Sequence, residues 1–141
     1  MRHQKRGRKF NRTASHRKAM MSNLASALIL YKRIKTTDAK GKELRGFVER
    51  LVTYAKQDSI HGRRLIQKKI KGTRSKEIAN ILIHEIAPSY ENRQGGYTRI
   101  IKLNNRKNDN AAVSLIEFVD MSPTVTDVEK NSEKDKGDSK E

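Results

Sequence analysis

The first eighteen residues carry the side chains with the clearest chemical character in the sequence. They hold two histidines and no Asp or Glu, and their eight cationic residues are Arg2, Lys5, Arg6, Arg8, Lys9, Arg12, Arg17 and Lys18. A flexible basic segment can reach phosphates that a globular surface cannot approach, and each neutralised phosphate releases condensed counterions. We therefore predict that residues 1–13 form a basic arm that binds a polyanion.

Patterns that would indicate catalysis are incomplete. His84-Glu85 begins like a zinc-protease motif, but position 88 is proline, so the second histidine one turn later is missing. Gly41-Lys42 lacks the glycine five residues upstream that a phosphate-binding loop requires. His3 and His16 have no neighbouring carboxylate to raise their basicity, so hydrogen bonding to RNA is the favoured interpretation. We expect no enzyme activity, no metal, no cofactor and no small-molecule substrate.

The composition favours a single basic domain with a small core. Lys and Arg number 32 against 16 Asp and Glu, which gives a formal charge of +16, and only 34% of the 141 residues are hydrophobic. Cysteine is absent, which excludes disulfides, thiolate nucleophiles and cysteine-ligated metal sites. The longest apolar run, residues 28–31, is far shorter than the roughly 20 residues of a membrane helix. We expect a soluble, cytoplasmic protein with no membrane partner.

Apolar residues at spacings of three and four predict the helices that must position the basic groups. Thr13 or Ser15 caps a helix over 14–31, and its predicted inward residues are Met20, Met21, Leu24, Ala27, Leu28 and Tyr31. Asp38 caps a second helix, whose inward residues are Leu44, Phe47, Val48, Leu51, Val52 and Ala55. Asp58-Ser59 caps a third over 60–70, with Gly72 just beyond its end. A fourth runs over 75–86 and ends at Ala87-Pro88.

The strands complete an order of α-β-α-α-α-β-β. The β-branched run 33–37 predicts a brief strand, and runs 97–103 and 111–119 predict a hairpin with a long basic tip. Beyond Asp120 the sequence is charged and almost free of apolar residues, so we predict that 122–141 is a disordered tail. The domain boundaries we expect are a basic arm at 1–13, one folded domain at 14–121 and the tail at 122–141.

The basic surface does not match a module that reads nucleic-acid sequence. Zinc ligands, a basic helix followed by heptads and a strand rich in stacking aromatics are all absent. Contacts to phosphate and sugar that follow the shape of a folded RNA fit the composition better. Phe10, Tyr90 and Tyr97 each lie near basic residues and have the chemistry to stack a base, but ordinary packing is the favoured interpretation for each.

Three motifs resemble one family in order and separation. The opening closely resembles the start of the bacterial large-subunit ribosomal protein family L-seventeen, through Met1-Arg2-His3, Gly7-Arg8, Asn11-Arg12 and Ser15-His16-Arg17. The internal segments resemble its signature at Ile34-Lys35-Thr36-Thr37, Lys42-Glu43-Leu44-Arg45 and Thr53-Tyr54-Ala55-Lys56. A late segment does so at Arg93 and Gly95-Gly96-Tyr97-Thr98-Arg99-Ile100. The resemblance covers about residues 1 to 120.

This resemblance implies a two-layer α+β domain whose helices cover a small sheet. It implies a structural constituent of the large ribosomal subunit, bound to its RNA and to neighbouring ribosomal proteins near the polypeptide exit side. The residues that it implies as threading between RNA segments are Arg2, His3, Gly7, Arg8, Asn11, Arg12, His16 and Arg17. Those that it implies as adding contacts from the folded body are Lys35, Arg93, Tyr97 and Arg99.

Two other classes of protein share part of this pattern. A nucleoid-type DNA-binding protein would have the same charge, but it should favour duplex DNA and present a dimer-forming surface. An RNA-modifying enzyme would need a cofactor fold or an acid–base constellation, and the sequence shows neither. The RNA-binding ribosomal hypothesis is therefore preferred, with general DNA or RNA binding as the alternative.

Overall fold

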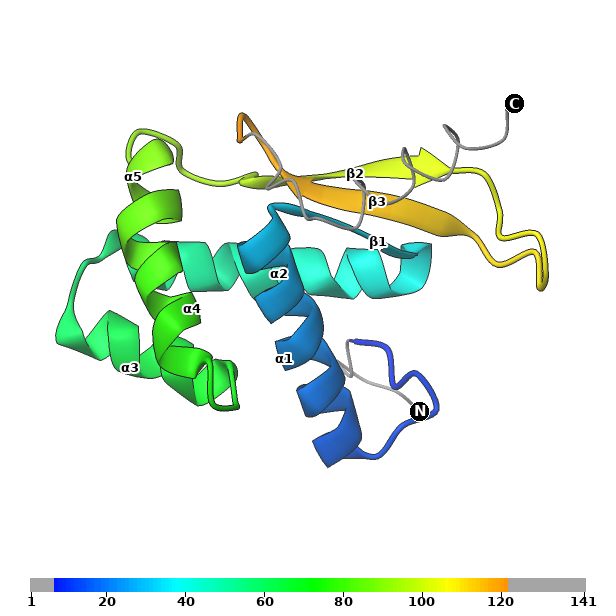
Figure 1. Ribbon diagram of the computed structural model, residues 1–141, viewed down its shortest axis with the longest axis horizontal. Coiled ribbons are helices and arrows are strands. Elements are labelled where there is room, and N and C mark those ends of the chain that lie inside the picture. Colours follow the sequence, from blue (N-terminus) through cyan, green and yellow to red (C-terminus); the bar gives the residue numbers. More distant parts are fainter. Residues whose placement is uncertain (1–6, 122–141) are drawn as a thin grey trace, which may run out of the picture.

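The computed structural model describes residues 7–121 and confirms the α+β class (Figure 1). The elements are α1 Ala14–Tyr31, β1 Arg33–Thr37, α2 Asp38–Lys56, α3 Ile60–Lys69, α4 Ser75–Ile81, the π-helical turn η1 Leu82–Ile86, α5 Ala87–Ser89, β2 Thr98–Leu103 and β3 Val113–Phe118. The predicted order is confirmed, although the fourth predicted helix divides into α4, η1 and α5. The helices lie against one face of the sheet, and the loop between β2 and β3 projects beyond α2.

The sheet has the strand order β1-β3-β2, with both pairings antiparallel. The hairpin is confirmed, and each of its strands is shorter than predicted. Ile34, Ile116 and Ile100 lie side by side in register across the three strands and join the core. On the opposite face Glu117 lies between Arg33 and Arg99, its two cross-strand partners.

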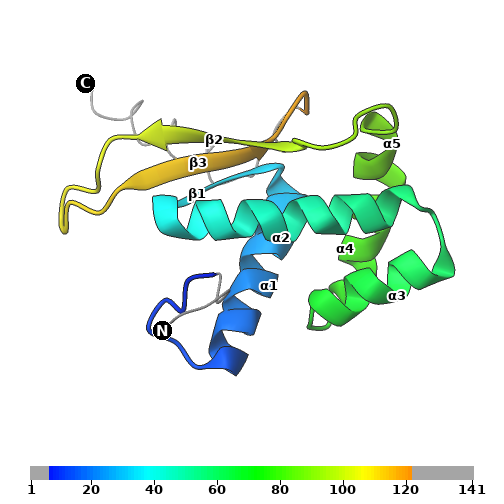
Figure 2. The ribbon, with the colours of Figure 1, turned by 180° about the vertical axis from the view of Figure 1, so that it is seen from behind.

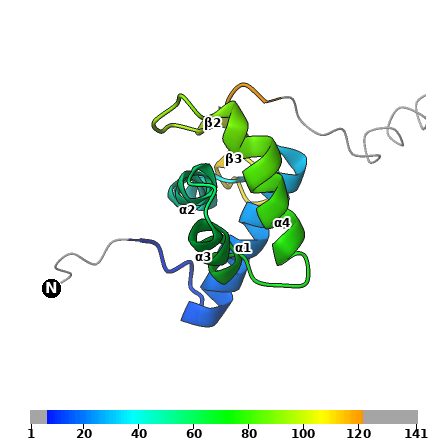
Figure 3. The same cartoon turned by 90° about the vertical axis from the view of Figure 1, so that its left-hand side faces the viewer.

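Helix α2 is the central element of the domain. Its predicted stripe is confirmed, because Leu44, Val48, Leu51, Val52 and Ala55 are at most 1% exposed. The helix runs along the sheet when seen from behind (Figure 2), and the end view shows α1, α3 and α4 grouped beside it (Figure 3). Since α2 contacts the sheet on one side and the other helices on the other, it sets the relative positions of both layers.

Helix α1 buries only part of the predicted face. Met21 and Leu28 are buried as predicted, but Ala25 and Ile29 are buried as well, whereas Tyr31, predicted to point inward, is 41% exposed. The reason is that α1 is apolar around much of its circumference, so several stripes are available, and packing against α2 and α4 selects one. The predicted cap at Thr13 is confirmed, since its hydroxyl accepts the His16 backbone N–H at 3.5 Å.

The other two predicted caps have different outcomes. Asp38 is the first residue of α2 and does not cap it, because its carboxylate is held by the Ser114 hydroxyl at 3.0 Å and by Lys42 at 2.8 Å. The hydrogen bond from Lys42, followed by that from Ser114, lowers the pKa of Asp38. Ser59 caps α3 as predicted, with its hydroxyl accepting the Gly62 N–H at 2.9 Å.

The prediction that Ala87-Pro88 ends the fourth helix is wrong, since helical backbone continues to Ser89. The turn before Pro88 is π-helical, and the Ala87 N–H donates to the Leu82 carbonyl five residues back. A wider turn moves the carbonyl that a proline ring would otherwise strike, and Pro88 itself needs no donor. The proline therefore fits inside the helical segment.

Candidate nucleic-acid interface

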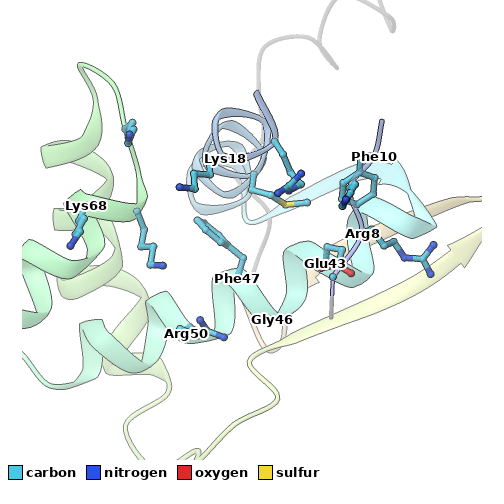
Figure 4. A pocket seen from close by; sticks show the side chains of 14 residues that line it. Arg8, Phe10, Lys18, Glu43, Gly46, Phe47, Arg50 and Lys68 are labelled. Carbon is cyan, nitrogen blue, oxygen red and sulfur yellow. The ribbon is translucent and has the colours of Figure 1, made fainter. Parts of the chain in front are cut away.

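A cleft of about 960 Å³ opens between the segment that precedes α1, the amino-terminal half of α1, α2 and the end of α3 (Figure 4). Four separate parts of the chain therefore meet in it. Its lining residues are Gly7, Arg8, Lys9, Phe10, Arg17, Lys18, Met21, Glu43, Gly46, Phe47, Arg50, Lys68, Lys69 and Lys71. Eight of these side chains are basic and one is acidic.

One wall of the cleft is a turn in the chain before α1. Phe10 and Asn11 have φ values of 56° and 49°, and the Arg12 N–H donates to the Lys9 carbonyl at 3.2 Å. Left-handed backbone at a phenylalanine is costly and persists only when surrounding contacts hold it. Here the half-buried Phe10 ring packs against the core, so residues 7–13 lie on the body of the protein.

The opposite wall is the end of α3, which close packing brings into position. A Cβ on Gly62 would lie 2.5 Å from the Tyr54 carbonyl oxygen, so only glycine permits this approach of α3 to the end of α2. At the other end of α3, the Lys71 backbone N–H donates to the buried Ser22 hydroxyl of α1 at 2.9 Å. These two contacts hold Lys68, Lys69 and Lys71 along the cleft.

The cations of the cleft have no acidic partner within residues 7–121. The ion pairs of this range join Lys32 to Glu85, Lys42 to Asp38, Arg45 to Glu49, Arg74 to Glu77, Arg93 to Asp120, Arg99 to Glu117 and Arg106 to Asp109. Every one of those cations lies outside the cleft lining, and Glu43, the single lining carboxylate, takes part in none of the pairs. A concave surface lined by one sign of charge concentrates the field and attracts counterions of the opposite sign.

The cleft gathers part of the predicted RNA-binding set. Gly7, Arg8, Lys9, Arg17 and Lys18 all line it. Asn11, Arg12 and His16 lie on the adjoining turn and first helical turn, where the Arg12 guanidinium contacts the exposed His16 ring. Arg2, His3, Lys5 and Arg6 fall outside the described residues, as does the predicted tail at 122–141.

The predicted contacts from the folded body lie elsewhere. Lys35 is exposed on β1, while Arg93 pairs with Asp120 at 3.1 Å and Arg99 pairs with Glu117 at 2.5 Å. These three residues therefore do not join the cleft, and two of them already have an acidic partner.

Tyr97 is almost fully buried, with 3% of the residue exposed, so its ring has no open face on which a base could stack. Its ring packs against Tyr90 at 5.3 Å between centroids, and Tyr90 in turn packs against Phe118 at 6.4 Å. The Tyr90 hydroxyl donates to the Val119 carbonyl, and burial raises the pKa of this tyrosine to about 12. The packing interpretation is thus confirmed for both tyrosines.

Sequence reasoning did not include Arg50, Lys68, Lys69 and Lys71 in the predicted site. They are basic residues of α2 and α3, and only the crossing of these helices with α1 brings them beside Arg8 and Lys18. One local signal was available, since residues 59–76 contain no carboxylate at all. An acid-free stretch of this length in a helical region marks a surface where cations stay unpaired.

Two further properties concern residues 7–121 alone. None of the helices in this range has the length and apolar character that a membrane crossing requires. The same range holds no group of three or more His, Asp or Glu side chains arranged to bind a metal ion.

Comparison with known proteins places the chain in a family. A family model described as Ribosomal protein L17 matches residues 20–119. A "Large ribosomal subunit protein bL17" of Amoebophilus asiaticus is 52% identical over 120 residues, which is 85% of this chain and 60% of the relative, so the chain spans less than two thirds of that protein. A protein of the same name from Methylacidiphilum infernorum is 50% identical over 120 residues, 85% of this chain and 89% of the relative. The chain belongs to the Ribosomal protein L17 family.

Proposed function

We propose that this protein is a structural constituent of the large ribosomal subunit in the cytoplasm, where it binds large-subunit ribosomal RNA through the basic cleft. The observation that carries the proposal is the set of eight cations lining one concave surface with no acidic partner within residues 7–121. Membership of the Ribosomal protein L17 family supports the ribosomal assignment, and both relatives are named as large-subunit proteins.

The mechanism requires no chemical reaction. RNA segments that converge on a folded site repel one another through their phosphates, and cations held in a fixed cleft reduce that repulsion while releasing counterions. Arg8 and Lys9 on the turn before α1 and Lys68 and Lys69 at the end of α3 line different parts of the cleft, so an RNA backbone lying along it meets positive charge over its whole length. The protein thereby stabilises a close approach of RNA segments.

The residues before the cleft extend this basic surface. Arg2, His3, Lys5 and Arg6 precede Gly7 directly, and we propose that they follow the RNA away from the cleft. The exposed Lys35 adds a contact from the sheet, whereas the paired Arg93 and Arg99 contribute less. Neighbouring large-subunit proteins near the polypeptide exit side are the protein partners we propose.

Co-sedimentation tests the ribosomal assignment. The full chain is mixed with large ribosomal subunits stripped of it, with duplex DNA as competitor, and sedimented at increasing salt. We expect stoichiometric retention at moderate salt and release only at concentrated salt. Transfer of the protein to the DNA at moderate salt would overturn the proposal in favour of general polyanion binding.

A deletion of residues 2–6 tests separately whether the residues before the cleft bind RNA. This deletion removes Arg2, Lys5 and Arg6 but keeps Phe10, whose ring packs against the core. We expect an unchanged melting temperature and a salt slope for RNA binding that falls by about 0.7 for each phosphate that the shortened protein leaves unneutralised. An unchanged slope would show that these residues neutralise no phosphate.

A further inference from the structure

The basic cleft contains two phenylalanine rings that phosphate binding alone does not require. Phe10 comes from the turn before α1 and Phe47 from α2, and both are half-buried. The Phe47 ring points from α2 toward α1 with Lys18 and Arg50 on either side of it, and Phe10 lies beside Arg8 (Figure 4).

These rings differ from the aromatic residues of the core. Within residues 7–121 the ring contacts join Tyr90 to Tyr97 and to Phe118, and neither cleft phenylalanine takes part in them. Phe47 lies at the edge of the α2 stripe, so one side of its ring packs on the core while the other is left to the cleft. Apolar surface left in water is unfavourable, which favours an occupant that covers it.

We propose that an unpaired nucleotide of the bound RNA inserts into the cleft and stacks its base on Phe47, while Lys18, Arg50 and Lys68 hold the adjoining phosphates. This proposal deepens the RNA-binding function and rests on it. Every nucleotide carries a flat π-face and a phosphate, which is the pairing of groups that the cleft presents. Phe10, on the turn before α1, closes the cleft around the same nucleotide.

The shape of the cleft favours an unstacked base over a duplex. Its volume of about 960 Å³ lies at the upper end of the range of roughly 300–1,000 Å³ for clefts that enclose small organic ligands. A paired base in an A-form helix has both faces covered by its neighbours, so an aromatic side chain reaches only a splayed nucleotide of a loop or bulge. An acidic protein segment with an exposed ring is the competing occupant, and eight cations against one carboxylate favour RNA.

Fluorescence tests the stacking directly, because the chain contains no tryptophan. Phe47→Trp introduces a single indole, and the matched control Tyr31→Trp places one at an exposed aromatic position outside the cleft lining. The probe is protein-free large-subunit ribosomal RNA at moderate salt. We expect saturating RNA to quench emission strongly at position 47 and weakly at position 31. Equal quenching at both positions, or none at 47, would overturn the proposal.

The identity of the occupant is tested in the intact subunit. If RNA covers the ring, the emission at position 47 should be the same in the assembled subunit as with RNA alone. A signal that changes only on assembly would show that a neighbouring protein covers Phe47, and the base-stacking proposal would be wrong.

Affinity measurements separate this proposal from the function on which it rests. Phe47→Leu keeps an apolar side chain on the core, so we expect an unchanged melting temperature and an affinity lower by roughly 5- to 150-fold, the range for removal of one base–aromatic stack. Its salt slope should stay the same, whereas Arg50→Gln, one turn along α2, should reduce the slope. If Arg50→Gln weakens RNA binding and Phe47→Leu does not, the stacking proposal would be wrong while the RNA-binding function would stand. No effect of either variant, with no preference for RNA over duplex DNA, would refute the binding function too.

Discussion

The cleft and the sheet face of this protein are both rich in basic residues, but they differ in where the acids lie. On the sheet side, Arg93, Arg99 and Arg106 each have a carboxylate partner within 3.1 Å. In the cleft, eight cations line the surface together with a single carboxylate, Glu43, which takes part in no ion pair of the described residues. The two regions therefore present different fields to an approaching polyanion, although the sequence around each is strongly basic.

If the protein binds RNA through the cleft as proposed, this difference makes the pairing of charges, more than basic content, the feature that selects the binding surface. Exposed ion pairs contribute little to folding stability, so the pairs of the sheet side have their main effect on the surrounding potential. Each pair offsets the field of one cation, whereas the eight cations of the cleft have no such partner within residues 7–121. The arrangement favours one orientation of the protein on its partner.

The largest effect should come from removing charge from the cleft. We expect the triple variant Lys68→Gln, Lys69→Gln and Lys71→Gln to weaken RNA binding on the order of 50-fold at 0.15 M salt, since each phosphate left unneutralised lowers the salt slope by about 0.7. The matched control removes the same charge from the paired side through Arg93→Gln, Arg99→Gln and Arg106→Gln. Filter binding over a range of salt concentrations measures both slopes. Equal reductions in affinity would mean that only net charge matters.

The next effect concerns the packing that builds the cleft. Gly62→Ala forces a Cβ against the Tyr54 carbonyl, so we expect a loss of about 1–3 kcal/mol in the free energy of unfolding. Gly46→Ala is the control, because it adds a methyl group where nothing lies within 4 Å and should stabilise α2 by roughly 0.5–1 kcal/mol. Urea denaturation measures both. A neutral Gly62→Ala would show that α3 is free to shift away from α2.

A smaller effect should follow from releasing one paired cation. Glu117→Gln frees Arg99 on the sheet face, and we expect binding to duplex DNA to strengthen by about 5- to 6-fold at 0.15 M salt, equivalent to one more neutralised phosphate at a salt slope of about 0.9. Glu91→Gln changes the net charge equally, but Glu91 is in no ion pair of the described residues. The preference for RNA over DNA should narrow only in Glu117→Gln. An identical response in both variants would argue against a specific role for the pairing.

The smallest effect concerns the ion pair between Arg106 and Asp109 at the hairpin tip, which should persist at low pH. The hydrogen bond from Arg106, followed by that from the Ala111 N–H, lowers the pKa of Asp109 to about 2 from an ordinary value of 3.8. Because the folded pKa lies below the unfolded one, this group stabilises the fold above pH 3.8 and its contribution is lost as the pH falls through 2. Carbon NMR of the carboxyl group should give a midpoint near 2, which Arg106→Gln returns toward 3.8. A midpoint of 3.8 in the unmodified protein would indicate that the pair is open in solution.

Local patterns predicted the fold where a single interpretation was available. The α2 stripe was clear because polar residues surround it, and the hairpin strands were clear from their β-branched runs. The inward face of α1 was ambiguous because apolar residues occur on several of its sides. The π-helical turn before Pro88 was not predictable, since it depends on hydrogen bonds five residues apart rather than on residue type.

The site was predictable only in the part that lies close together in the chain. Arg8, Lys9, Arg17 and Lys18 form a dense basic segment that charge alone identifies. The wall formed by Lys68, Lys69 and Lys71 is about fifty residues away, and its position depends on how α3 packs on α2. Tyr97 is the opposite case: the sequence motif around it resembled the family and suggested an RNA contact, but its side chain is buried in the core.

The strand order β1-β3-β2 also bears on the protein before it has met its RNA. Within residues 7–121 both outer strands have an open edge, and an open edge is a template on which a second copy can add a strand and begin aggregation. Arg33 and Lys35 lie on β1, and Arg99 and Lys102 lie on β2. Because each edge strand carries two basic residues, two copies that approach edge to edge meet like charge. The sheet is thereby protected while the newly made chain is still free.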